Sequence, residues 1–157
     1  MSGIGNIGEI QIIDFLKKEV GYAIYLPLKD VGIDFIGVKS NKFFQFQIKT
    51  STFQKNSYFW FDIHKHKMVY GRNIFYVFIC YTMSRHNMMG KSRNFLVIPS
   101  LDLKKWINNN QIPLKKGSDT ILNIFVYPDV ENQKWIFKNK GQEIDWTKYW
   151  NNFKQLK

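Results

Sequence analysis

Apolar residues near the start of the chain recur at helical spacing and predict an amphipathic helix over residues 6–20, with Gly21 as its stop signal. The apolar stripe of this helix is formed by Ile12, Ile13, Leu16 and Val20. Glu9 precedes these residues by three, four, seven and eleven positions, so it lies on the same inward face. A carboxylate there requires an explanation, because burying an unpaired charge is costly.

Short β-branched and aromatic runs separated by turn residues predict strands along the rest of the chain. The predicted strands span residues 22–28, 32–38, 42–51, 58–63, 74–81, 95–98, 121–127 and 134–138. The first three follow one another closely and predict a meander, and a short helix or turn is expected over 64–71. The continuously apolar run at 74–81 is typical of a central strand covered on both faces.

Two further helices are expected, each beginning at a residue type that commonly caps helices. Ser100 would cap a helix with Leu103, Trp106 and Ile107, and Asp145 would cap a closing helix over 145–156. One face of the closing helix would carry Trp146, Tyr149, Trp150 and Phe153. These elements predict an α/β fold, a central mixed sheet flanked by helices in the order α-β-β-β-α-β, with an added C-terminal hairpin and helix.

The composition is that of a globular domain with a substantial core. Hydrophobic residues make up 45% and aromatic residues 17% of the 157 residues. Because no linker or low-complexity segment interrupts the chain, residues 1–157 are interpreted as a single domain. Cys80 lies within an apolar run and is expected to be a buried thiol. With no signal-peptide pattern and no long apolar segment, the expected location is cytoplasmic, without a membrane partner.

Positive charge is concentrated in the middle of the chain. The formal net charge is +11, and residues 61–118 hold ten Lys and Arg against two Asp. Such a field favours a phosphate-rich partner, because neutralising phosphates releases condensed counterions. Since no basic amphipathic helix is evident there, nucleic acid is favoured over a membrane surface. The alternative interpretation is that the charge only keeps an aromatic-rich protein in solution.

Polar side chains interrupt one face of two neighbouring predicted strands. Side chains alternate between the two faces of a strand, so Gln45, Gln47 and Lys49 share one face of residues 42–51. Asp34 lies on the preceding strand, after the short turn that would join the two. If the strands form a hairpin, Asp34 lies near Gln47 and Lys49, and the inward Glu9 can reach the same place.

This arrangement suits phosphodiester hydrolysis assisted by a cation. Asp34, the side-chain carbonyl of Gln47 and the backbone carbonyl of Ile48 are hard oxygen donors of the kind preferred by Mg²⁺ or Mn²⁺. Such a cation would orient and acidify an attacking water and offset charge in the transition state. Lys49, on the same face, would lower the pKa of that water further or neutralise the developing oxyanion.

These residues resemble the active-site pattern of the PD-(D/E)XK nuclease superfamily. An acidic residue on the first helix is followed by Gly-x-Asp on one strand and Gln-x-Lys on the next. The variant with Gln at the second acidic position is similar to Mrr-like restriction enzymes, some small homing endonucleases and an uncharacterised prokaryotic branch. That branch also shares the pattern of residues 95–100 before a helix and the Trp-rich terminal segment. The resemblance extends through about residue 107.

The resemblance implies a restriction-endonuclease-like core, endonucleolytic cleavage of DNA, and a Mg²⁺ or Mn²⁺ cofactor. It assigns Glu9, Asp34, Gln47 and Lys49 as catalytic, with Asp34, Gln47, Ile48 and Glu9 as metal ligands. It also implies a homodimer or homotetramer. Gln47 departs from the commoner carboxylate, which predicts weaker metal binding and disfavours a second metal. Asp30 is a competing candidate for the leading acid, but it lies in a predicted turn, so Asp34 is preferred.

Other basic and aromatic residues are candidates for contact with the nucleic acid. The predicted phosphate-binding residues are Lys65, Lys67, Arg72, Arg85, Lys91 and Arg93, the last three in a long basic loop. Tyr58, Trp60 and Tyr127 are candidates for stacking on bases, although aromatic residues in strands more often cover a sheet. The pair His64 and His66 has no third ligand nearby, so a structural zinc site is not expected.

Alternative interpretations remain open at this stage. Glu9 would also suit the first turn of a helix through the helix dipole, and Asp34 with Lys49 would also suit a structural ion pair. Gln45 and Gln47 would also suit an edge strand. At the level of function, the alternatives are a structure-selective Holliday-junction resolvase, a nucleic-acid-binding module with a lapsed nuclease site, and a purely structural or interaction protein. RNA is an alternative substrate to DNA.

Overall fold

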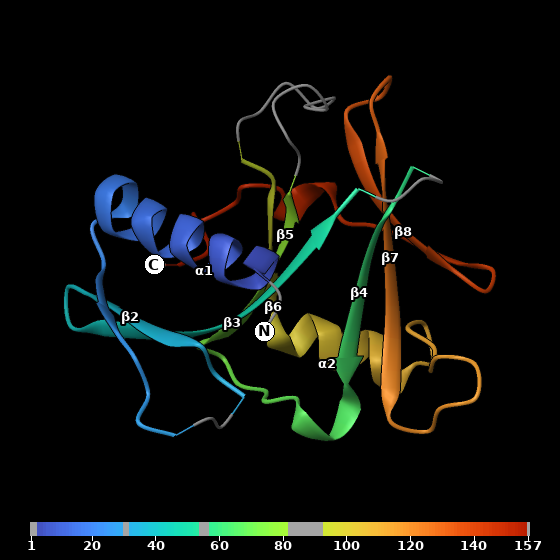
Figure 1. Cartoon of the computed structure of the whole chain (residues 1–157), viewed down its shortest axis with the longest axis horizontal. Helices are drawn as coiled ribbons and strands as arrows, with labels where there is room; N and C mark the ends of the chain where they lie inside the picture. The colour runs from blue at the N-terminus through green and yellow to red at the C-terminus, as the bar shows by residue number, and fades with distance from the viewer. Residues whose placement is uncertain (1–2, 30–31, 54–56, 82–92, 157) are drawn as a thin grey trace.

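The computed structural model describes residues 3–29, 32–53, 57–81 and 93–156. Its elements follow the order that Figure 1 shows from blue to red. The helices are α1 (Gly3–Phe15) and α2 (Ser100–Asn108), with single turns at Leu16–Val20, Lys65–Lys67 and Thr147–Tyr149. The strands are β1 (Ala23–Tyr25), β2 (Phe35–Lys39), β3 (Lys42–Thr52), β4 (Phe59–His64), β5 (Ile74–Tyr81), β6 (Phe95–Pro99), β7 (Ile121–Asp129), β8 (Lys134–Asn139) and β9 (Gln142–Asp145).

The first sheet contains five strands in the order β1-β2-β3-β5-β6. Strands β3 and β5 are parallel, whereas the other neighbouring pairs are antiparallel, so the sheet is mixed as expected. The predicted meander corresponds to β1, β2 and β3. Residues Ile74 to Cys80 of β5 are buried without interruption, which confirms the predicted central strand.

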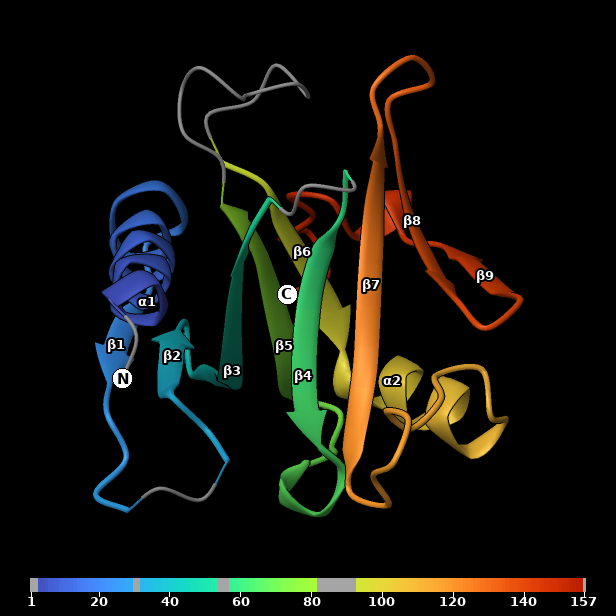
Figure 2. The same ribbon diagram turned by 45° about the vertical axis from the view of Figure 1, so that its right-hand side comes forward.

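A second sheet stands beside the first, with the order β4-β7-β8-β9 (Figure 2). The parallel strands β3 and β5 need a crossover, and here the crossover runs through β4 and the short turn at Lys65–Lys67 instead of a longer helix. The expectation of one central sheet was therefore incomplete. The predicted α/β class is confirmed, but the strand at residues 59–64 and the C-terminal hairpin belong to a sheet of their own.

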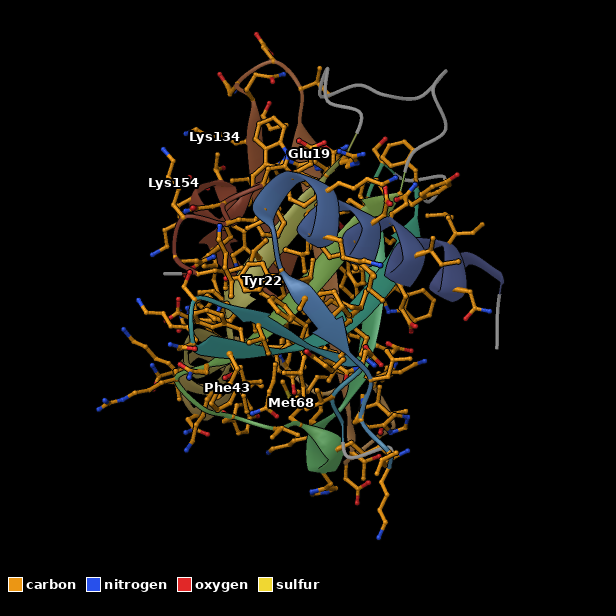
Figure 3. All side chains as sticks on the ribbon, turned by 90° about the vertical axis from the view of Figure 1, so that its left-hand side faces the viewer. Glu19, Tyr22, Phe43, Met68, Lys134 and Lys154 are labelled. Atoms are coloured by element: carbon orange, nitrogen blue, oxygen red, sulfur yellow. The ribbon has the colours of Figure 1, made fainter. Side chains whose placement is uncertain are left out.

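Two hydrophobic clusters hold these layers together. One lies between the two sheets, where the rings of Phe61 on β4 and Phe78 on β5 approach to 5.0 Å between centroids. The other lies between α1 and the opposite face of the first sheet, where Ile12 and Leu16 of α1 are fully buried. Figure 3, which views the molecule from the side of α1, shows the helix lying across this face.

The predicted closing helix over residues 145–156 was wrong. Residues up to Asp145 extend the second sheet as β9, and the backbone N–H of Trp146 donates to the carbonyl of Trp135. A turn at Lys140 and Gly141, both with positive φ, folds β9 back onto β8. Trp146 and Tyr149 are buried because they fill the space between the sheets, so their spacing reflects tertiary packing and not a helix face.

The predicted role of Ser100 was also wrong. The residue capping α2 is Pro99, while Ser100 is fully buried and bonds to another segment of the chain. Its Oγ donates to the carbonyl of Gly71 at 2.9 Å and accepts from the backbone N–H of Gly71 at 3.0 Å. Ser100 therefore ties the start of α2 to the turn before β5.

In the part of the chain that the structure describes, no helix is long and apolar enough to cross a membrane.

Candidate active site

A cavity of about 200 Å³ lies where the start of β2, the middle of β3 and the end of β4 meet. It contains three of the four predicted catalytic side chains, one from the residue just before β2 and two from β3. The lining residues are Gly32, Asp34, Gln47, Lys49, Ile63, His64, Lys67, Met68 and Tyr76. The predicted convergence of Asp34, Gln47 and Lys49 is thus observed.

The β2–β3 hairpin determines this convergence. Ser40 and Asn41 form a two-residue turn and both have positive φ, as a type I′ hairpin turn requires. The resulting register pairs Phe35 with Phe46, so Asp34 falls opposite Gln47. A shift of one residue would turn these polar side chains to the face covered by α1. The turn is therefore part of what builds the site.

Hydrogen bonds to β3 orient the carboxylate of Asp34. Its backbone N–H donates to the carbonyl of Phe46 at 2.8 Å, and its Oδ2 accepts from the backbone N–H of Ile48 at 2.6 Å. Bonds to an ionised acceptor are stronger than neutral ones. The carboxylate is consequently held at one position on the wall of the cavity, as a metal ligand or a catalytic group would need.

Gln47 carries an unsatisfied oxygen. Its Oε1 is buried and has no hydrogen-bond partner among the described residues. Leaving a buried acceptor unpaired costs about 1–3 kcal/mol, and a cation or donor bound in the cavity would remove this cost. Since β3 lies between β2 and β5, the alternative that Gln45 and Gln47 are edge-strand residues is wrong.

Glu9 approaches the site from α1 but is not among the residues lining the cavity. Burial raises the pKa of its carboxyl, and the negative charge of nearby Asp34 raises this pKa further. The first turn of α1 contains no acidic residue, so the helix-dipole explanation for Glu9 does not hold. A carboxyl group whose ionisation is disfavoured by a neighbouring carboxylate is one whose charged form a cation would stabilise.

The raised pKa of Glu9 predicts a pH-dependent stability in the absence of metal. The folded state holds the Glu9 proton more tightly than the unfolded state, so folding stability falls as the pH rises from the ordinary glutamate pKa through the raised one. Glu9→Gln should remove this fall and become relatively more stable as the pH increases. Urea denaturation in EDTA over a pH series measures the free energy of unfolding of both proteins. Parallel curves of this free energy against pH would contradict the prediction.

Several residues of the cavity wall were not predicted from the sequence. Tyr76 lies at the start of β5, and burial raises its pKa to about 12, so its hydroxyl keeps its proton. That hydroxyl donates to the carbonyl of Val69 and accepts from its N–H. Gly32 has positive φ and lies against the backbone carbonyl of Lys67, where a Cβ would collide. The only sequence signal for this contact was the glycine itself, two residues before Asp34.

The predicted phosphate-binding residues fall into different regions. Lys67 lines the cavity, while Lys65 and Arg72 are exposed in the segment between β4 and β5. Arg93 instead packs over the ring of Phe15 on α1, 5.3 Å from its centroid. Arg85 and Lys91 lie outside the described residues, as does Asp30. Contact of these residues with phosphate remains a prediction.

The candidate donor atoms at this site are mainly oxygen atoms. Within residues 3–29, 32–53, 57–81 and 93–156, no cluster of three or more His, Cys, Asp or Glu side chains is arranged to hold a metal. A site built from Asp34, Glu9, the Gln47 amide and a backbone carbonyl contains only two such residues. The donor chemistry therefore fits a hard cation such as Mg²⁺ and not a structural zinc ion.

Comparison with solved structures relates this fold to a nuclease. The chain superposes on a bacterial homing endonuclease, I-Ssp6803I, with a TM-score of 0.58 and 15% sequence identity, over 98% of this chain and 88% of that one. The two proteins share a fold. The sequence itself matches no protein-family model and no curated protein. At this identity the similarity shows the fold alone, so activity has to be argued from the cavity.

Proposed function

We propose that this protein is a divalent-metal-dependent endonuclease that hydrolyses DNA phosphodiester bonds. The observation that carries the proposal is the buried, unpaired Oε1 of Gln47 in one cavity with Asp34 and Lys49. An unpaired acceptor beside a fixed carboxylate suits a cation, and a lysine on the same wall suits an anionic transition state. The endonuclease fold of the structural neighbour and the basic middle third support nucleic acid as the substrate.

The ligands we propose for the cation are Asp34, Gln47, the carbonyl of Ile48, and Glu9. In an antiparallel ladder the N–H and C=O of one residue point toward the same neighbouring strand. Because the N–H of Ile48 bonds to Asp34, the carbonyl of Ile48 points to the side of the strand where Asp34 lies. A cation bound there would polarise a water molecule for attack and neutralise negative charge on the scissile phosphate.

The protein's own groups would orient the reactants. Asp34 is held by Ile48, and Lys49 presents its ammonium from the same wall of the cavity, where it can donate to the attacking water or to a phosphate oxygen. Lys67, on the turn that closes the cavity, would bind a neighbouring phosphate. Tyr76, which remains protonated, keeps the Val69 backbone in place beside this turn.

Cleavage assays test the proposal directly. Plasmid, linear duplex, four-way junction and single-stranded DNA would be incubated with Mg²⁺, Mn²⁺ or EDTA, with an RNA duplex in parallel. We expect cutting only in the presence of metal. Cutting restricted to junctions would identify a resolvase, and DNA binding without any cutting would identify a module whose nuclease site has lapsed. Sedimentation of the same protein measures whether it forms the homodimer or homotetramer that double-strand cutting would favour.

Gln47→Glu tests the proposed metal ligands without requiring activity. A second carboxylate beside Asp34 should lower thermal stability in EDTA, because like charges would be buried together. It should also bind Mn²⁺ more tightly, and tenfold tighter binding adds about 1.4 kcal/mol of stability at saturating metal. Melting temperatures with EDTA and with increasing Mn²⁺ provide the measurement. Gln45→Glu, on the same face of β3 but outside the cavity lining, is the matched control. Equal responses of the two variants would argue against Gln47 as a ligand.

A further inference from the structure

Aromatic side chains form a continuous group on the outer face of the second sheet. Tyr58, just before β4, has its ring 5.4 Å from Phe125 and 5.5 Å from Tyr127, both on β7. Trp60 on β4 stacks against Phe125 at 6.1 Å and is 38% exposed. We call Tyr58, Trp60, Phe125 and Tyr127 the aromatic platform. Their side chains point away from the core, since the alternate residues of β4 and β7 are the buried ones.

Lysine ammonium groups lie over the platform. Lys115 is 5.1 Å from the ring centroid of Trp60, and Lys138 is 5.8 Å from that of Tyr127. Beside them is a hollow of about 540 Å³, a size typical of ligand sites. It is lined by Tyr58, Phe125, Tyr127, Lys138, Asn139, Lys140, Gly141, Gln142 and Glu143. The platform therefore combines aromatic rings, cations and amide groups around one depression.

Acidic groups offset part of the positive charge around the platform, but two lysines remain able to bind phosphate. Asp62 contacts Lys115 at 3.6 Å and accepts from the indole N–H of Trp60, and Glu143 lies at the rim of the hollow. Lys140 donates to the carbonyl of Leu114, while Lys138 is exposed over Tyr127. Lys138 is therefore the group best placed to bind an incoming phosphate, and Lys140 is the second. When Lys138 turns toward the phosphate, the ring of Tyr127 becomes accessible to a base.

This combination fits an unpaired nucleic-acid strand. Single-strand-binding surfaces pair positive side chains that follow the backbone with aromatic rings on which bases stack, whereas in a duplex the base faces are already stacked on one another. Strand β4 also links the platform to the candidate active site. Tyr58, which lines the hollow, lies at one end of this strand, and His64, which lines the cavity, lies at the other end. A strand of six residues spans about 20 Å, within reach of a short stretch of DNA.

We propose that the aromatic platform binds single-stranded DNA by stacking, with Lys138 and Lys140 contacting its phosphates. The choice of DNA rests on the proposed nuclease function, whereas the binding itself does not require cleavage. Trp60 and Tyr127 would each stack on a base once Lys115 and Lys138 turn away from their rings, and the hollow beside Tyr58 would accept a third base. The strand would leave the platform along β4 toward the cavity.

Binding of a fluorescently labelled oligothymidylate, measured by anisotropy in EDTA, tests this proposal. Wild type should bind it more tightly than a duplex of equal length. Trp60→Ala and Tyr127→Ala should each weaken binding about tenfold, as loss of one stacked base does, whereas Tyr127→Phe should change it less than about twofold. Lys138→Gln should reduce the slope of log affinity against log salt by about 0.7, one phosphate contact on a single strand.

Phe43→Ala is the matched control, because Phe43 is a 50% exposed aromatic residue on the first sheet, labelled in Figure 3. It should leave oligothymidylate binding unchanged, and circular dichroism would verify that every variant is folded. Equal binding by wild type, Trp60→Ala and Tyr127→Ala would overturn the proposal. It would also be overturned if wild type bound no DNA but self-associated, and if these two variants lost the self-association. Because the assay is run in EDTA, where no metal-dependent cleavage takes place, its result reports on binding at the platform and not on cutting at the cavity.

Discussion

Lys49→Met is expected to lower the rate of DNA cleavage about 10²–10³-fold while leaving DNA binding and folding intact. The side chain of Lys49 faces the cavity from the middle of β3, and methionine retains its apolar length without the charge. Asp34→Asn should cause a loss of at least this size. Asparagine can still accept the hydrogen bond from Ile48, so the hairpin should persist while the negative charge is lost. Single-turnover cleavage in Mg²⁺ or Mn²⁺ gives the rates.

Two variants with similar changes elsewhere serve as controls. Lys42→Met removes an exposed lysine from the same strand, and Asp14→Asn removes a partly exposed carboxylate from α1 that pairs with Lys18. Neither residue lines the cavity, so both variants should cut at the wild-type rate. The assignment of the site would be overturned if the control variants lost as much activity as Lys49→Met and Asp34→Asn, or if all four cut normally.

The second large effect is expected at Gly8, where α1 packs closely on β3. A Cβ at Gly8 would lie 3.0 Å from Cβ and Cγ2 of Thr50 and would collide with its hydroxyl, so the helix would have to move. Overpacking of this kind costs about 1–3 kcal/mol. Because Glu9 follows directly, Gly8→Ala should also displace its carboxylate, and displacement of about 1 Å can lower catalysis about 100-fold. Urea denaturation and cleavage rates measure the two effects.

A double-mutant cycle with Thr50 checks the mechanism. The Oγ1 of Thr50 is buried without a hydrogen-bond partner among the described residues, so Thr50→Ala should change stability by less than about 1 kcal/mol. Combined with Gly8→Ala, it should restore more than half of the lost stability, because it removes Oγ1 and Cγ2, two of the three Thr50 atoms that the new methyl group meets. Strictly additive effects would show that Gly8 acts through something other than this contact. Gly5→Ala, in the same helix, is the control for helix propensity.

The candidate site was predictable where it depends on local sequence. Asp34, Gln47 and Lys49 converge because a two-residue turn joins strands whose side chains alternate, and all of these features lie within sixteen residues. Cys80 is buried as expected, and burial raises the pKa of its thiol. The position of Glu9 was only partly predictable. Its inward face followed from helical spacing, but its distance from the cavity depends on how closely Gly8 lets α1 approach β3.

Errors arose where one pattern suits two structures. Trp146 and Tyr149 have the spacing of a helix face, yet these residues follow a strand and fill the gap between sheets. Ser100 has the residue type of a cap, yet its hydroxyl bonds to Gly71. In both cases the partner is distant in sequence, and burial against that partner outweighs the local preference.

By itself the sequence determined the first helix, the meander, the central apolar strand and the polar face of the hairpin, because helical spacing, strand alternation and short turns act over a few residues. Only the tertiary structure decided that β4 pairs with β7 in a second sheet instead of joining the first. This pairing places His64 and Lys67 at the wall of the cavity and turns Trp60 outward. Such pairing joins segments about sixty residues apart, and its energy comes from burying aromatic rings between two sheets.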